Sequence, residues 1–221
     1  MGRQGSKGEF DVREAFELAS LLSSRLCHDL VSPVGAVTNG LEVLADETEA
    51  DMRDSAMRLI TESADRAARK LQFARLAYGA GGGPQAIIDM GDARKITAAM
   101  LNDIKVALEW KCDFATTDRM LAKMLVNSAF LAAESLPRGG TVIAAMRHEA
   151  GSTVIDVQAE GPMMKPMDQL QEIISGAVEL GGLAPRAAQA YYTGLISRCL
   201  EGKLLLTVSD KTLIIRDSFR E

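Results

Sequence analysis

The sequence predicts an α+β protein in which an N-terminal helical hairpin precedes a domain of mixed strands and helices. Three observations predict this fold class: two long stretches have apolar residues in helical spacing, a glycine-rich segment follows them, and paired β-branched stretches come later. The predicted units are a helical hairpin at 1–78, a linker at 79–84 and an α/β sandwich at 85–221.

The first helix is expected from about residue 12 to 45 and the second from 52 to 78. Along the first, apolar or small residues recur in steps of three and four at Ala15, Leu18, Leu22, Leu26, Leu30, Pro33, Val37, Leu41 and Leu44. A similar stripe in the second includes Met52, Leu59, Leu71 and Tyr78. Each stripe is wider than one neighbouring helix can cover, so we expect two chains to pair as a homodimer with a four-helix bundle.

The stretch "YGAGGGPQ", residues 78–85, separates the hairpin from the second domain, because glycine ends helices and proline cannot continue them. Beyond it we expect strands at 86–90 and about 105–110, and two hairpins at 141–149 with 153–160 and 204–209 with 212–217. The expected helices are one opened by Asp92, one at about 118–136, and stretches near 166–179 and 185–200.

Charge, apolar runs and cysteine spacing argue against several classes of function. The net charge is −5 and no basic run is present, which argues against nucleic-acid binding. No apolar run approaches the ~20 residues that a bilayer requires, and the N-terminus does not resemble a secretory signal, so we expect no membrane association and a cytoplasmic location. The three cysteines, Cys27, Cys112 and Cys199, lie too far apart for a zinc motif and are expected to be buried thiols.

A histidine stands out within "RLCHDLVSPVGAV", residues 25–37. At 100° per residue, His28 points about 180° away from the mean direction of Leu26 and Leu30, so its ring should face solvent. Asp29 follows directly and can hold the tautomer of the ring. Pro33 should bend or loosen the helix. The neighbours expected on the same outer face are Ser24, Arg25, Ser32 and Gly35.

This segment resembles the phospho-accepting H-box of sensor histidine kinases, and more closely the ChpT-type histidine phosphotransferases of alphaproteobacteria. The likeness continues through "DMRDSAMRLITESA", "LQFARLAYGA", "LPRGG" and "QAYYTGL", in order and at matching spacing, and so covers nearly the whole chain. The resemblance implies a dimeric four-helix bundle and a second domain that looks like a degenerate histidine-kinase ATP domain.

Three departures from the kinase pattern predict that this domain does not bind ATP. Asn127 begins the kinase N-box, but Leu131 stands where the asparagine that holds Mg²⁺ would be. Ala159 replaces the aspartate that reads adenine, and Met163 replaces the second glycine of that motif. The glycine-rich lid is reduced to "YYTGLIS", which keeps only Gly194.

The resemblance therefore implies a phosphotransferase that is not an autokinase. His28 accepts the phosphoryl group and Asp29 orients it, while Ser24, Arg25, Ser32, Gly35 and Asn39 contact the partner, with Arg25 offsetting phosphate charge. No metal or cofactor site is expected, since Mg²⁺ belongs to the partner receiver domain. The implied partners are the receiver of a CckA-like hybrid kinase and CtrA-like and CpdR-like response regulators.

Two alternatives remain open from the sequence. One is a divergent but active histidine kinase that still binds ATP in its second domain. The other is a non-catalytic dimeric adaptor that captures receiver domains without accepting phosphate.

Overall fold

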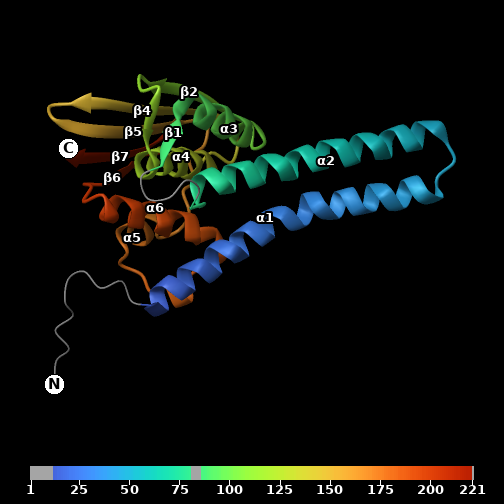
Figure 1. Ribbon diagram of the computed structural model, residues 1–221, viewed down its shortest axis with the longest axis horizontal. Coiled ribbons are helices and arrows are strands. Elements are labelled where there is room, and N and C mark those ends of the chain that lie inside the picture. The colour runs from blue at the N-terminus through green and yellow to red at the C-terminus, as the bar shows by residue number, and fades with distance from the viewer. Residues whose placement is uncertain (1–11, 81–85, 221) are drawn as a thin grey trace.

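The computed structural model describes residues 12–80 and 86–220. Two long helices, α1 (Val12–Asp46) and α2 (Ala50–Ala77), form the predicted hairpin, which projects away from the second domain (Figure 1). At its tip Arg53 Nη1 donates to the carbonyl oxygens of Leu44 and Glu47, each at 2.8 Å, which closes the turn between the helices. α1 continues through the buried Pro33 without a break.

The remaining elements follow in mixed order. They are β1 (Ile87–Asp89), α3 (Met90–Asn102), β2 (Val106–Cys112), β3 (Thr116–Asp118), α4 (Arg119–Glu134), β4 (Gly140–Glu149), β5 (Ser152–Glu160), α5 (Leu170–Ser175), the 3₁₀ turns Leu180–Gly182 and Pro185–Ala187, α6 (Ala188–Cys199), β6 (Leu205–Val208) and β7 (Thr212–Arg220). The α+β class and both predicted β-hairpins are confirmed.

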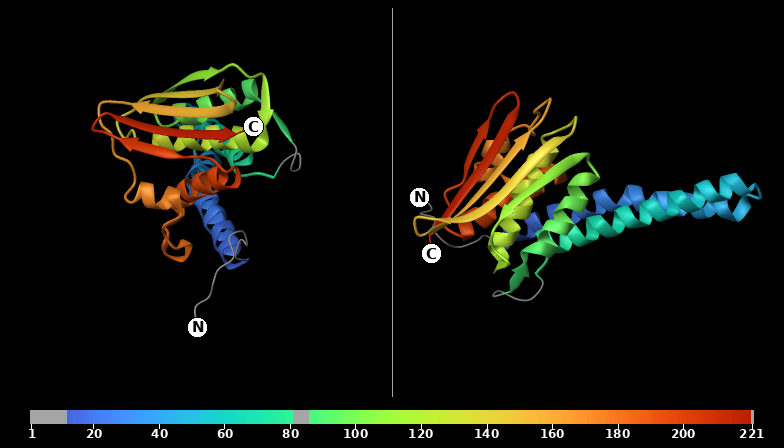
Figure 2. Two further views of the ribbon diagram at one scale, coloured as in Figure 1. Left: turned by 90° about the vertical axis from the view of Figure 1, so that its left-hand side faces the viewer. Right: turned by 90° about the horizontal axis from the view of Figure 1, so that it is seen from above.

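One five-stranded sheet in the order β2-β4-β5-β7-β6 forms the centre of the second domain, and its helices cover one face of it (Figure 2). β2 runs parallel to β4, and the other neighbours are antiparallel. Side chains along the strands alternate between a buried face and a solvent-exposed face of the sheet. In β4, for example, Val142, Ala144 and Met146 are buried. On the other face Arg216 of β7 pairs with Asp156 of β5.

Three details differ from the sequence prediction. Asp92 does not open α3, because the extended Asp89 caps it and accepts a hydrogen bond from the Asp92 backbone N–H at 2.8 Å. The helix expected over 166–179 is only α5, since Gly176 takes a left-handed conformation with φ +77° and ends it. β3 was not foreseen; its three residues pair with β1 in a separate two-stranded sheet.

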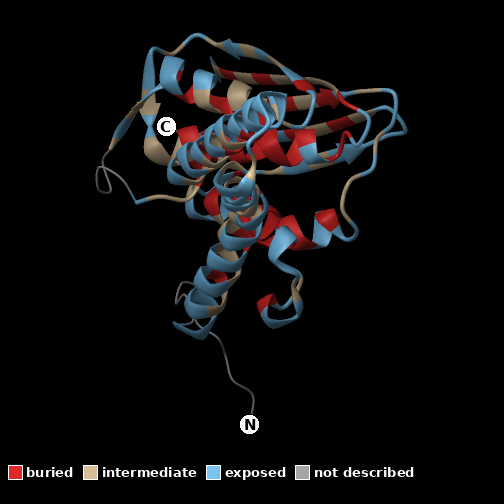
Figure 3. Ribbon diagram, turned by 90° about the vertical axis from the view of Figure 1, so that its right-hand side faces the viewer, coloured by how far each residue is buried: buried red, intermediate tan, exposed pale blue. Residues whose placement is uncertain are grey.

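The base of the hairpin is packed against the second domain. Leu18, Phe73 and Ala77 belong to the same hydrophobic core as the helices and strands of that domain, and the rings of Phe73 and Phe130 lie 5.0 Å apart. α2 ends at Ala77, one residue before the predicted limit of the hairpin; residues 81–84 of the predicted linker lie outside the described residues. Figure 3 shows that the buried residues concentrate here and in the second domain, while the projecting hairpin is mostly exposed.

Candidate functional site

His28 lies on the solvent side of α1, as its helical position predicts. Its side chain is 84% exposed. Ser24, Ser32 and Asn39 are also exposed, and Gly35 is partly exposed. These residues fall within about 40° of His28 around the helix axis, so they form one face with it. We call Ser24, His28, Ser32, Gly35 and Asn39 the outer face of α1.

The carboxylate of Asp29 sits beside the imidazole. Its Oδ1 atom lies 3.5 Å from Nδ1 of His28, a long contact that leaves Nε2 uncovered by Asp29. The other oxygen, Oδ2, accepts a hydrogen bond from Nε of Arg25 at 2.9 Å. Lys70 on α2 donates to the backbone carbonyl of the same residue at 2.8 Å. Asp29 is therefore held from two directions while it faces the ring.

The prediction that Arg25 lies on the outer face of α1 is wrong. Its side chain is only 8% exposed and points into the junction with the second domain. There Nη2 donates to Glu134 Oε1 at 2.6 Å and Nη1 donates to the carbonyl oxygen of Arg186 at 3.1 Å. Arg25 stands 60° around the helix from His28, on the flank that the second domain covers. Helical spacing could not reveal this, because the neighbour comes from a distant part of the chain.

At this junction the positive charge of Arg25 faces the carboxylates of Glu134 and Asp29. Burial lowers the pKa of Arg25, but the carboxylates of Glu134 and Asp29 raise it more, and the net effect is upward. The pKa of Glu134 is raised by desolvation, against the opposing effect of Arg25. The Arg25 guanidinium also lies over the Phe130 ring, 5.9 Å from its centre.

The residues at the kinase motif positions in the second domain serve as packing. Leu131 and Ala159 are buried in the hydrophobic core of the second domain. Asn127 is buried and donates to the carbonyl oxygens of Ala77 and Lys123. A side chain at Gly194 would place its Cβ 1.8 Å from the carbonyl oxygen of Ile174, so this glycine permits close helix contact.

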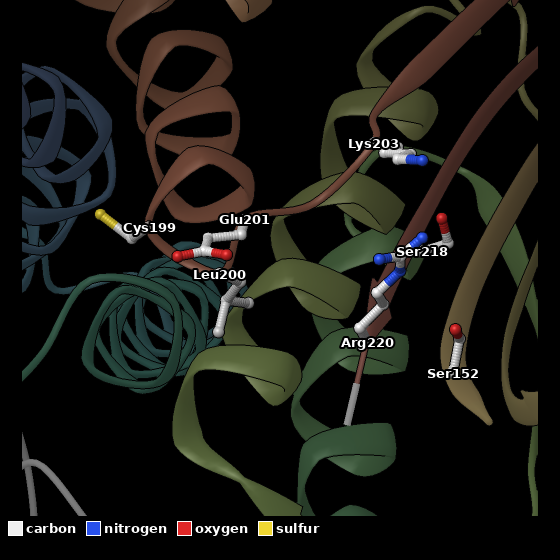
Figure 4. Close-up of a pocket in the computed structure, with 7 residues that line it drawn as sticks. All are labelled: Ser152, Cys199, Leu200, Glu201, Lys203, Ser218 and Arg220. Atoms are coloured by element: carbon white, nitrogen blue, oxygen red, sulfur yellow. The ribbon is translucent and has the colours of Figure 1, made fainter. Parts of the chain in front are cut away.

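The loop after β5 lies against the end of α4. The backbone N–H of Lys165 donates to the Ser135 carbonyl at 2.8 Å, and a cavity of about 330 Å³ remains between the two segments. The described residues that line it include Leu131, Glu134 and Arg186. A larger cavity of about 600 Å³ is bordered by residues of β5, α6 with its following turn, and β7 (Figure 4).

The second histidine and the cysteines, which are the other residues that could bind a metal, do not form a site among the described residues. His148 is exposed and stacks edge-on against Phe114 at 4.7 Å, in agreement with a structural role. The expectation that the cysteines are buried is wrong for Cys27 and Cys199, which are exposed. Within residues 12–80 and 86–220, no group of three histidine, cysteine or acidic side chains could hold a metal ion. No helix of that part is long and apolar enough to cross a membrane.

The fold and this histidine together define a class of protein: a helical hairpin that presents an exposed histidine beside a carboxylate and packs its base against an α/β domain. The comparisons with known proteins identify the family. Residues 90–212 match the model of the histidine phosphotransferase C-terminal domain. The protein phosphotransferase ChpT of Brucella abortus (strain 2308) is 34% identical over 183 residues, which are 83% of this chain and 86% of that protein.

One solved structure agrees with this assignment. A bacterial phosphotransferase solved at 1.7 Å is similar with a TM-score of 0.80 and 30% identity, over 92% of this chain and 96% of the other. A blue-light activated histidine kinase domain from Erythrobacter litoralis has a TM-score of 0.48 and 16% identity, over 84% and 95% of the two chains. The chain belongs to the histidine phosphotransferase family, and it is a phosphotransferase.

Proposed function

We propose that the protein relays a phosphoryl group between the aspartates of receiver domains through His28, without using ATP. The observation that carries this proposal is the exposed imidazole of His28, with Asp29 beside Nδ1, in a chain of the histidine phosphotransferase family. A nucleophile needs both an open approach and a defined tautomer, and the outer face of α1 offers both.

The chemistry follows from these positions. With its proton on Nδ1, facing Asp29, the ring keeps a free lone pair on Nε2. That lone pair attacks the phosphorus of an aspartyl phosphate, the N–P bond forms, and the bond from phosphorus to the carboxyl oxygen breaks to release a carboxylate. Asp29 balances the positive charge that develops on the ring. A second receiver's aspartate then attacks the phosphorus and breaks the N–P bond.

The outer face of α1 is the proposed docking surface for the receivers. Ser24 and Ser32 have short side chains, and a Cβ added at Gly35 would meet no atom within 4 Å, so a partner can approach the helix closely around His28. By resemblance, the Mg²⁺ that neutralises the phosphoryl group is supplied by the receiver. By resemblance, the donor is a CckA-like hybrid kinase and the acceptors are CtrA-like and CpdR-like regulators in the cytoplasm.

The lack of ATP chemistry is proposed from the second domain. Leu131 and Ala159 carry no oxygen or nitrogen in their side chains, and both are buried. Mg²⁺ takes oxygen ligands, and adenine recognition needs a hydrogen-bonding group. Millimolar ATP should therefore leave the melting temperature unchanged, because only a ligand that binds the folded state raises it.

The homodimer is proposed from exposed apolar residues on the hairpin. Leu41 on α1 and Met52 and Leu59 on α2 belong to the predicted stripes, yet they are exposed in one chain. Met52 and Leu59 are seven residues apart, which places both on one face of α2, as in a bundle seam. Pairing with a second copy would cover these side chains and complete a four-helix bundle.

The deciding experiment incubates the full chain with a phosphorylated receiver domain and measures acid-labile phosphate on the chain, with His28→Ala as the control. Phosphate on the wild type alone supports the relay. Binding of the receiver without phosphate on the chain supports the adaptor alternative. Phosphate gained from ATP alone, with no receiver present, supports the kinase alternative.

A further inference from the structure

A chain of charged contacts runs from the second domain to the candidate nucleophile. Glu134, the last residue of α4, contacts Arg25, Arg25 contacts Asp29, and Asp29 faces His28. The three separations are 2.6 Å, 2.9 Å and 3.5 Å. Glu134 is 109 positions from Arg25 in the sequence, so only the tertiary fold brings it here.

Each of the three guanidinium nitrogens of Arg25 donates a hydrogen bond at this junction. Nη2 binds Glu134, Nη1 binds the carbonyl oxygen of Arg186, and Nε binds Asp29. A guanidinium is planar and rigid, so fixing two of its nitrogens on the second domain also fixes the direction of the third. The direction of Nε in turn selects the rotamer of Asp29 in which Oδ2 faces Arg25 and Oδ1 faces the imidazole.

We propose that Glu134 is a positioning residue for phosphoryl transfer, acting on His28 through Arg25 and Asp29. The second domain thereby holds the tautomer of a histidine that lies on the hairpin. This inference rests on the proposed function of His28, and it gives the α/β domain a part in the transfer reaction that needs no nucleotide.

The opposing interpretation is that Glu134 only fastens the second domain to the hairpin. A second ion pair across the same junction offers a matched control: Arg69 of α2 donates through Nη2 to Asp103 Oδ1 at 2.7 Å, and Asp103 follows the end of α3. The hydrogen bonds of this pair join Arg69 to Asp103 and do not involve His28, Asp29 or Arg25. Breaking this pair should loosen the junction without affecting the tautomer of His28.

The first test compares Glu134→Gln and Glu134→Ala with Asp103→Asn in the full chain. The measurements are the ¹⁵N chemical shifts of the His28 ring, which report the proton-bearing nitrogen, and the single-turnover rate of transfer from a phosphorylated receiver. We expect Glu134→Ala to slow transfer about tenfold, Glu134→Gln to slow it less, and both to shift the tautomer balance away from Nδ1–H. Asp103→Asn should change neither measurement.

The second test asks whether Glu134 acts through Asp29. Asp29→Asn alone should slow transfer; adding Glu134→Ala should then slow it less than about twofold further, because residues in one pathway are not additive. Full additivity would overturn the proposal. So would unchanged ¹⁵N shifts in Glu134→Gln, which keeps the size of the side chain. If the wild type itself gains no phosphate on His28, the proposed function fails instead, so the two failures are distinguishable.

Discussion

The side-chain amide of Asn127 donates a hydrogen bond to the carbonyl oxygen of Ala77 at 3.1 Å, and this contact joins the last residue of α2 to the middle of α4. The same amide donates to the Lys123 carbonyl at 2.8 Å, and its oxygen accepts from Gln189 of α6 at 3.3 Å. One buried side chain thus connects the hairpin with two helices of the second domain.

Asn127→Ala should destabilise the protein without altering His28, the proposed phosphate acceptor. The substitution leaves the Ala77 carbonyl and the Gln189 amide without their buried partner, which costs about 2 kcal/mol of unfolding free energy. Urea unfolding measures this loss. Asn102→Ala, on an exposed position of α3, is the matched control and should change stability by less than about 0.5 kcal/mol. Equal stability of the two variants would show that the hydrogen bonds of the Asn127 side chain do not stabilise the fold.

Gly35→Trp should block receiver docking while leaving His28 intact. Gly35 lies seven residues beyond His28, about 10 Å along α1 and nearly on the same face. A Cβ there meets no atom within 4 Å, so the chain itself can accept a side chain, but a helix of a partner would meet the indole. Receiver affinity and transfer rate should both fall at least about tenfold.

Two variants complete this experiment. His28→Ala should lose transfer but keep receiver affinity within about twofold, because its exposed ring contributes little to packing. Gly35→Ala should behave as the wild type. If Gly35→Trp binds and transfers normally, the outer face of α1 is not the docking surface.

Leu59→Glu should weaken the proposed dimer. Leu59 is exposed on α2 in a single chain, and burying a carboxylate in a bundle interface without a partner is unfavourable. Light scattering should detect a monomer at micromolar concentration where the wild type is a dimer. Lys95→Glu, an exposed position on α3, is the control and should remain dimeric. A monomeric wild type would disprove the four-helix bundle.

The sequence predicted those features that depend on local spacing. The limits of both hairpin helices and the exposure of His28 follow from 3.6-residue periodicity, and the two β-hairpins follow from β-branched runs around short turns. The position of Arg25 could not be predicted in this way. A helical wheel shows which face a residue occupies, but not that the second domain covers the flank beside His28.

The position of Glu134 could not be predicted from local spacing either. In the sequence it is an acidic residue at the end of a helix, and such residues are usually solvated. Nothing within its own segment relates it to a histidine 106 positions away. Only the tertiary contact of Glu134 with Arg25 of α1 brings it near that histidine.

Asp217 provides the clearest pH dependence of stability. Its side chain is buried in β7, Oδ1 accepts from the Ser218 N–H at 2.8 Å, and Oδ2 has no hydrogen-bond partner within residues 12–80 and 86–220. Burial raises its pKa to about 6, against the opposing hydrogen bonds from Ser197, Ser218 and Lys203. Since the folded-state pKa is above the unfolded value, the protonated form favours folding. This stabilisation is complete below about pH 4 and is lost as the pH rises through about 6.

Asp217→Asn removes this titration and isolates its effect. We expect the wild type to lose roughly 2 kcal/mol of unfolding free energy relative to the variant between pH 4 and pH 7, because ionising a buried carboxyl is unfavourable. Other carboxylates titrate equally in both proteins and cancel in the comparison. The measurement is urea unfolding of both proteins at half-unit steps of pH. A difference in stability that stays constant across this range would show that Asp217 remains ionised, and that its oxygens have partners beyond those named above.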